Sequence, residues 1–190
     1  MECNFITIVS GLPRSGTSMM MQALQAGGMP VLTDEIRTSD IENPKGYYEF
    51  EPVKKTKDDP SWVPQAIGKV VKMVYRLLYD LPKDYEYRVI FMDRNIAEIM
   101  VSQRTMLERS GKKGADIDDE KLALLLKEEL EKTYKWVKEQ DNFSMISIGY
   151  KDMVQNPLPQ CALVNEFLGN PLDTEKMASV IDASLYRNRR

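Results

Sequence analysis

A run of β-branched and aromatic residues that leads into a glycine-bounded loop constrains the fold of this chain most. Residues 5–10 predict a buried strand, Gly11 and Gly16 bound the loop, and residues 17–24 predict a helix. The unpaired N–H groups at a helix start, together with the helix dipole, attract an anion. The stretch therefore predicts a phosphate-binding loop or, as the alternative, a strand–turn–helix corner that holds no ligand.

The loop nearly matches the phosphate-binding loop of nucleoside triphosphatases, G-x-x-x-x-G-K-[ST], over residues 11–18. It departs at the position that requires lysine, where this chain has Thr17, and the cation lies earlier, at Arg14. The hydroxyls of Thr17 and Ser18 and the Arg14 guanidinium can still contact an anion. The displaced cation argues against nucleoside triphosphate chemistry.

Composition bounds the kind of protein. The chain has 190 residues, 43% apolar and 29% charged, which suits a single globular domain over residues 1–190. The net charge of -3 differs from the basic charge of nucleic-acid-binding domains, so we expect no nucleic-acid partner. No run is long and apolar enough to span a membrane, and the first strand leaves no place for a signal peptide. The two cysteines, Cys3 and Cys161, lack the spacing of a metal site or a disulfide framework, so we expect a cytoplasmic location.

Strands and helices alternate along the chain, with no internal repeat and no linker. Residues 88–92 predict a buried strand, and Asn95 followed by Glu98 matches the capping box of a helix start. The other expected strands are residues 29–33, 69–75 and 143–148, and the other expected helices are residues 17–26, 76–81, 121–140, 159–168 and 174–181. This alternation predicts an α/β fold with a mostly parallel central sheet flanked by helices. Ligands of such sheets bind at the carboxyl ends of the strands.

A second candidate anion site follows the strand at residues 88–92. Arg94 lies at the carboxyl end of that strand, and Ser102 follows it by eight residues, two turns into the next helix. A guanidinium and a hydroxyl placed in this way can clamp a phosphate. The alternative is that Arg94 pairs with Asp93 or Glu98 and that Ser102 only bonds within its helix.

These two sites, in this order, resemble the sulfotransferase family, and the likeness is greatest to small bacterial sulfotransferase-like proteins. The family motif [KR]-S-G-T-[ST] appears at residues 14–18, and the family's arginine-to-serine spacing of eight matches Arg94 and Ser102. The resemblance implies a three-layer P-loop-type fold that binds 3′-phosphoadenosine 5′-phosphosulfate without a metal. It also implies that Arg94 and Ser102 hold the 3′-phosphate. The residues implied for the 5′-phosphosulfate are Pro13, Arg14, Ser15, Gly16, Thr17 and Ser18.

Two later segments extend the resemblance. Residues 148–153, with Phe-Leu-Gly at 167–169, are similar to a family segment whose tyrosine lies beside the adenine, which implies that role for Tyr150. Some family members place a basic C-terminal segment on the 3′-phosphate, and Arg187 offers similar charge here. The alternative for Arg187 is a solvated chain end.

The resemblance implies in-line transfer of a sulfuryl group to a hydroxyl or amine, leaving 3′-phosphoadenosine 5′-phosphate. Cytosolic sulfotransferases use a histidine base, but this chain has no histidine. Tyrosylprotein sulfotransferases use a glutamate at the distance from the loop where this chain has Glu35. Asp34 and Glu49 are further candidate bases, and Arg14 is expected to neutralise charge in catalysis. The acceptor is expected to be a small molecule, a glycan or a peptide.

Two rival functions remain open from the residues. The first is a nucleotide-binding protein without catalysis, because the common base is missing. The second is a P-loop kinase or nucleoside triphosphatase. This function is disfavoured because Thr17 stands where the P-loop pattern requires lysine. The site is expected to be either open to solvent or completed by a second copy in a homodimer.

Overall fold

Four parallel strands in the order β2-β1-β3-β4 form the centre of the computed structural model. They are β1 (Phe5–Gly11), β2 (Val70–Lys72), β3 (Glu86–Asp93) and β4 (Phe143–Gly149). The structure describes residues 4–34, 46–109, 111, 117–169 and 172–185. Because β1 and β3 pair in register along their whole length, with Gly11 opposite Met92, their carboxyl ends lie side by side.

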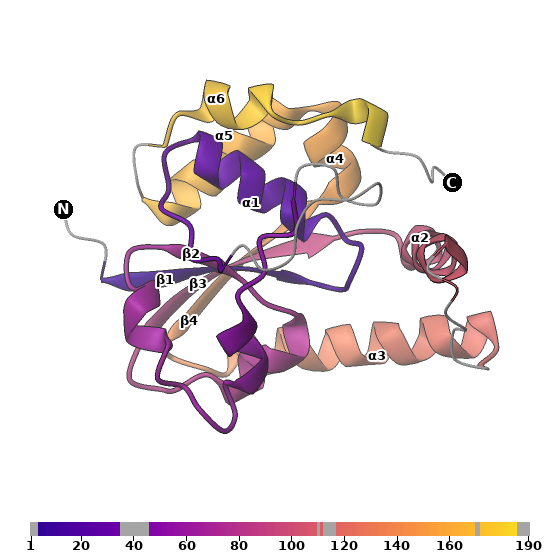
Figure 1. Cartoon of the computed structure of the whole chain (residues 1–190), viewed down its shortest axis with the longest axis horizontal. Coiled ribbons are helices and arrows are strands. Elements are labelled where there is room, and N and C mark those ends of the chain that lie inside the picture. Colours follow the sequence, from indigo (N-terminus) through magenta and orange to yellow (C-terminus); the bar gives the residue numbers. More distant parts are fainter. Residues whose placement is uncertain (1–3, 35–45, 110, 112–116, 170–171, 186–190) are drawn as a thin grey trace.

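Helices cover both faces of the sheet (Figure 1). One layer contains α1 (Thr17–Ala26), α4 (Tyr150–Gln155), α5 (Pro157–Leu168) and α6 (Thr174–Ser179). The opposite layer contains α3 (Asp119–Lys138) with the 3-10 helices η1 (Glu51–Lys55), η2 (Val63–Ala66) and η3 (Tyr75–Asp80). Helix α2 (Ile96–Arg109) lies beyond the end of β3, and η4 (Ala183–Leu185) ends the described chain. The three layers confirm the predicted α/β fold.

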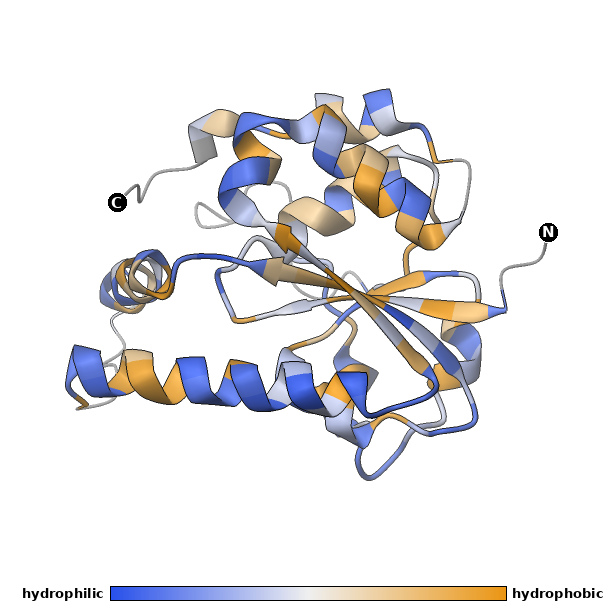
Figure 2. Ribbon diagram, turned by 180° about the vertical axis from the view of Figure 1, so that it is seen from behind, coloured by the Kyte–Doolittle hydropathy of each residue, from blue (hydrophilic) through white to orange (hydrophobic). Residues whose placement is uncertain are grey.

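Alternating side chains of the strands supply two separate cores. Ile8 of β1 and Phe91 of β3 are buried on the face covered by α3. Val9 and Ile90, one residue away, are buried on the face covered by α1 and α5. A parallel sheet needs this cover on both faces, which is why its central strands are apolar throughout. Figure 2 shows α3 with hydrophobic and hydrophilic residues interleaved, as an amphipathic helix at the surface requires.

Two predicted strands differ from the structure. Residues 29–33 form only an isolated bridge between Val31 and Val70, because Pro30 has no N–H to extend a ladder. The strand predicted over residues 69–75 is limited to Val70–Lys72, and the 3-10 helix η3 begins at Tyr75. The expected helix start at Asn95 is confirmed, since its Oδ1 accepts hydrogen bonds from the N–H of Ala97 at 2.9 Å and of Glu98 at 3.3 Å.

None of the helices in the described part of the chain combines the length and the apolar content that crossing a bilayer demands.

Candidate functional site

The loop of residues 11–18 lies at the carboxyl end of β1, beside the end of β3. Two glycines let it pack closely. A Cβ at Gly11 would lie 2.7 Å from the carbonyl oxygen of Met92, and a Cβ at Gly16 would lie 2.4 Å from the ring of Tyr150. Gly16 has φ +102°, and Arg14 takes φ +71°, a conformation that costs free energy in a residue other than glycine. The loop therefore has a specific shape that its neighbours impose.

The hydroxyl of Ser15 is the unsatisfied polar group of this loop. Ser15 is fully buried, and its Oγ, like that of Ser10, has no hydrogen-bond partner among the described residues. Buried hydroxyls in proteins are usually paired. An orphaned donor inside a loop at a helix start is therefore consistent with a ligand that completes it.

Arg14 and Arg94 connect the two predicted anion sites by reciprocal hydrogen bonds. Arg14 Nε donates to Ser102 Oγ at 3.0 Å, so the first loop reaches into the second site. Arg94 Nη1 donates to the carbonyl oxygen of Arg14 at 3.0 Å, so the second site supports the first loop. Residues 80 or more positions apart in the sequence thus form one cationic cluster at the carboxyl edge of the sheet.

Arg94 is enclosed by two further groups. Its Nε lies 3.1 Å from Glu98 Oε2, and the side chains are only 8% and 4% exposed. Its guanidinium carbon lies 4.2 Å from the ring centroid of Tyr150, within the range of a cation–π contact. Burial raises the pKa of the Tyr150 phenol, and the positive charge of Arg94 opposes that rise. The pairing of Arg94 with Glu98, which the sequence offered as an alternative to a phosphate site, is therefore present.

Lys72 is a component of the site that the sequence interpretation missed. It is the last residue of β2, and its Nζ donates to Ser18 Oγ at 3.3 Å and to the carbonyl oxygen of Tyr47. Ser18 Oγ also donates to that carbonyl, at 3.3 Å. The available signal was a lysine at the carboxyl end of an apolar strand. The strand order, which places β2 beside β1, was needed to bring it to the loop.

The predicted carboxylate bases have different outcomes. Glu49 is described, with its carboxylate Oε2 3.6 Å from Lys54 Nζ and its carbonyl accepting a 2.8 Å hydrogen bond from Thr33 Oγ1. Glu35 and Arg187 lie outside the described residues. Of the other loop residues, Thr17 begins α1 and Pro13 is exposed.

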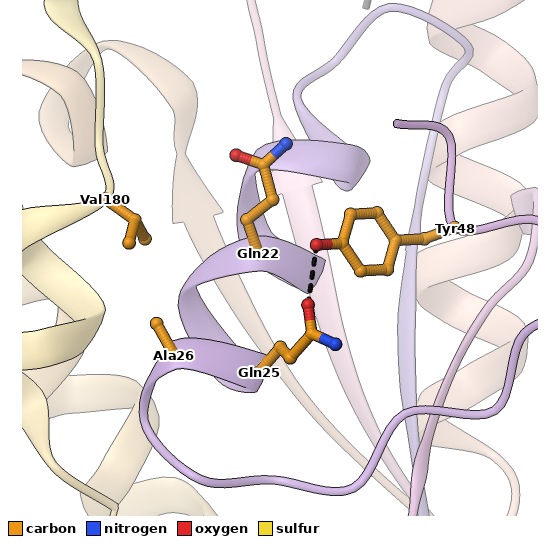
Figure 3. A pocket seen from close by; sticks show the side chains of 5 residues that line it. All are labelled: Gln22, Gln25, Ala26, Tyr48 and Val180. Carbon is orange, nitrogen blue, oxygen red and sulfur yellow. Dashed lines mark hydrogen bonds between the residues drawn. The ribbon is translucent and has the colours of Figure 1, made fainter. Parts of the chain in front are cut away.

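A surface pocket of about 300 Å³ lies along α1, beyond its first turn (Figure 3). Its lining residues are Gln22, Gln25, Ala26, Tyr48 and Val180. Tyr48 takes φ +54°, and its hydroxyl donates to Gln25 Oε1 at 2.7 Å, which joins two of the lining side chains. None of the lining residues belongs to the cationic cluster, so the pocket is not the anion site.

The chain belongs to the sulfotransferase family, because the family model described as "Sulfotransferase domain" matches residues 6–190. A search of curated proteins finds no match. Family membership supports a sulfotransferase function and, since the family generally uses 3′-phosphoadenosine 5′-phosphosulfate, is consistent with that donor.

Solved sulfotransferase structures share the fold at low sequence identity. Sulfotransferase STF9 from Mycobacterium avium aligns at TM-score 0.59 and 13% identity, covering 100% of this chain and 70% of that one. The sulfotransferase domain of the Synechococcus PCC 7002 olefin synthase aligns at TM-score 0.55 and 12% identity, covering 100% of this chain and 89% of that one. The sulfotransferase domain from the curacin biosynthetic pathway aligns at TM-score 0.54 and 14% identity, covering 97% of this chain and 90% of that one.

The packing of Gly16 against Tyr150 predicts a stability difference between two glycine substitutions. Gly16→Ala is expected to lower the free energy of unfolding by roughly 2–5 kcal/mol, because backbone strain and overpacking against the ring add. Gly28→Ala is the matched control: Gly28 has φ +100°, but a Cβ there meets nothing within 4 Å. It is expected to cost only about 1–2 kcal/mol. Urea unfolding of both variants measures the difference, and equal losses would contradict the packing of Tyr150 on the loop.

Proposed function

We propose that this chain transfers a sulfuryl group from 3′-phosphoadenosine 5′-phosphosulfate to a hydroxyl or amine of an acceptor. The observation that carries the proposal is the reciprocal pair of hydrogen bonds, Arg14 to Ser102 and Arg94 to the Arg14 carbonyl. This pair joins two cationic sites into one cluster. A nucleotide with separate phosphate groups at its 5′ and 3′ positions needs two such sites at a short distance from one another.

The residues of the cluster fit such a nucleotide. The N–H groups at the start of α1, the orphaned Ser15 hydroxyl and the Arg14 guanidinium suit the 5′-phosphosulfate. Arg94 and Ser102 suit the 3′-phosphate. Tyr150, whose ring lies between Gly16 and Arg94, suits the adenine. The bound nucleotide supplies an activated sulfuryl group with a phosphate as its leaving group.

The chain's own residues supply charge stabilisation and position. Lys72 and Ser18 are donors that meet at the start of α1, and Arg14 lies in the loop just before it, with its Nε on Ser102. Cations and N–H groups held in place before the reaction stabilise the charge that develops on the leaving phosphate, at no cost of reorganisation during the step. Fixed donors of this kind are the main contribution of a protein to group transfer between phosphate-like esters.

A carboxylate takes the proton of the acceptor in this proposal, since the chain has no histidine. Of the three carboxylates that follow the first helix, Glu35 and Glu49 are the two candidates that we propose. Glu49 lies two residues after Tyr47, whose carbonyl accepts hydrogen bonds from Ser18 and Lys72. That connection keeps the backbone of Glu49 close to the transfer site and supports its candidacy. The acceptor is a small molecule, a glycan or a peptide.

The position of Lys72 predicts a catalytic defect. Lys72→Met is expected to lower the rate of 3′-phosphoadenosine 5′-phosphate release by roughly 100- to 1,000-fold, the usual effect of losing one charge-stabilising donor. Lys69→Met is the matched control, because Lys69 immediately precedes β2, at the end of the strand opposite to Lys72. Its rate is expected to stay near that of the unmodified protein. A Lys72→Met variant as fast as the control would exclude Lys72 from the reaction.

The choice of base is tested by Glu35→Gln and Glu49→Gln, assayed separately with the donor nucleotide and a panel of hydroxyl and amine acceptors. The variant that removes the base is expected to bind the product nucleotide with normal affinity. Its rate of forming that nucleotide from the donor is expected to fall at least about 100-fold. Full activity in both variants would refute a glutamate base. If the unmodified protein binds the nucleotide but transfers no sulfuryl group to any acceptor of the panel, it is a nucleotide-binding protein without catalysis.

A further inference from the structure

We propose that Glu98 is a positioning residue of the anion site: its buried carboxylate orients the Arg94 guanidinium and thereby sets the affinity for the nucleotide. The identity of the ligand rests on the proposed function above. Glu98 contacts Arg94 directly, and we infer that it acts through Arg94.

The burial of the pair distinguishes it from an ordinary surface ion pair. The side chains of Glu98 and Arg94 are 4% and 8% exposed, and Nε and Oε2 are 3.1 Å apart. Exposed pairs at helical i,i+4 spacing contribute little, whereas a buried charge must be paired to be tolerated. Glu98 is also fixed from its own side, since its N–H donates to Asn95 Oδ1 at the helix cap. This bond fixes the backbone of Glu98, and the burial of its side chain confines the carboxylate beside Arg94 Nε.

The contacts of Arg94 come from three different parts of the fold. Glu98 on α2 accepts a hydrogen bond from Nε, and the Arg14 carbonyl in the loop accepts one from Nη1. The Tyr150 ring at the start of α4 lies against the guanidinium. Of these three contacts, Glu98 is the one with a negative charge. Three directions of contact determine both the position and the plane of a guanidinium, and the plane decides whether its fork can meet a phosphate.

Electrostatic repulsion alone would give Glu98 the opposite effect on the affinity for the nucleotide. A negative charge beside a phosphate site repels the ligand, so its removal would strengthen binding. Positioning predicts that its removal weakens binding, because Arg94 then loses the group that orients it. The two effects differ in sign, so a single isosteric substitution distinguishes them.

The test is the dissociation constant of 3′-phosphoadenosine 5′-phosphate, measured by titration calorimetry on the full chain. Glu98→Gln is expected to weaken binding roughly 10- to 100-fold, as when a carboxylate that orients a metal-binding histidine is lost. Glu108→Gln is the matched control, since it removes the same charge from an exposed position of the same helix. It is expected to leave the constant within about twofold. Unchanged or tighter binding in Glu98→Gln overturns the proposal.

A double-mutant cycle separates positioning from a general structural effect. Arg94→Met is expected to weaken binding, and Arg94→Met with Glu98→Gln is expected to bind no more weakly than Arg94→Met alone. If Glu98→Gln weakens binding by the same factor in both backgrounds, Glu98 does not act through Arg94 and the proposal fails.

Folding and ligand identity are controlled separately. If circular dichroism shows Glu98→Gln to be unfolded, Glu98→Asp replaces it. Its shorter side chain keeps the charge but withdraws from Nε, so the same weakening is expected and unchanged binding again overturns the proposal. If the unmodified protein does not bind the nucleotide, it is the proposed function that fails.

Discussion

The hydrogen bond from Arg94 to the carbonyl oxygen of Arg14 is the interaction on which the rest of the site depends. It brings two guanidinium groups to the same edge of the sheet, where their like charges repel. The buried carboxylate of Glu98 and the face of the Tyr150 ring offset that repulsion. Because Tyr150 also packs at Gly16, the shape of the loop and the placement of the second site are coupled.

The source of the lysine distinguishes this loop from that of a nucleoside triphosphatase. In the triphosphatase pattern the lysine belongs to the loop itself. Here Thr17 occupies that position, and the ammonium that reaches Ser18 comes from Lys72, at the end of the neighbouring strand β2. The loop after β1 and the lysine at the end of β2 therefore together supply the groups that a single loop supplies in the triphosphatase pattern. The Arg14 side chain donates to Ser102.

Local patterns predicted the parts of the fold and site that depend on local chemistry. The β-branched run of β1, the glycines at 11 and 16, and the Asn95 cap are short-range features, and each was placed correctly. The sequence could not predict that β2 lies beside β1, since strand order depends on packing between distant segments. Lys72 was missed for that reason. For Arg94, the pairing with Glu98 is present together with a hydrogen bond to the loop, because a guanidinium has several donors, and the phosphate contact stays a prediction.

In the proposed function, Arg14 and Arg94, with Ser102, form one site for a nucleotide phosphorylated at both its 5′ and 3′ positions. Titration calorimetry of the unmodified protein with 3′-phosphoadenosine 5′-phosphate, adenosine 5′-monophosphate and ATP–Mg tests this most directly. We expect the bisphosphate to bind most tightly, at least about tenfold better than the monophosphate, because only it engages both sites. Tighter binding of ATP–Mg, or equal binding of the monophosphate and the bisphosphate, would contradict this expectation.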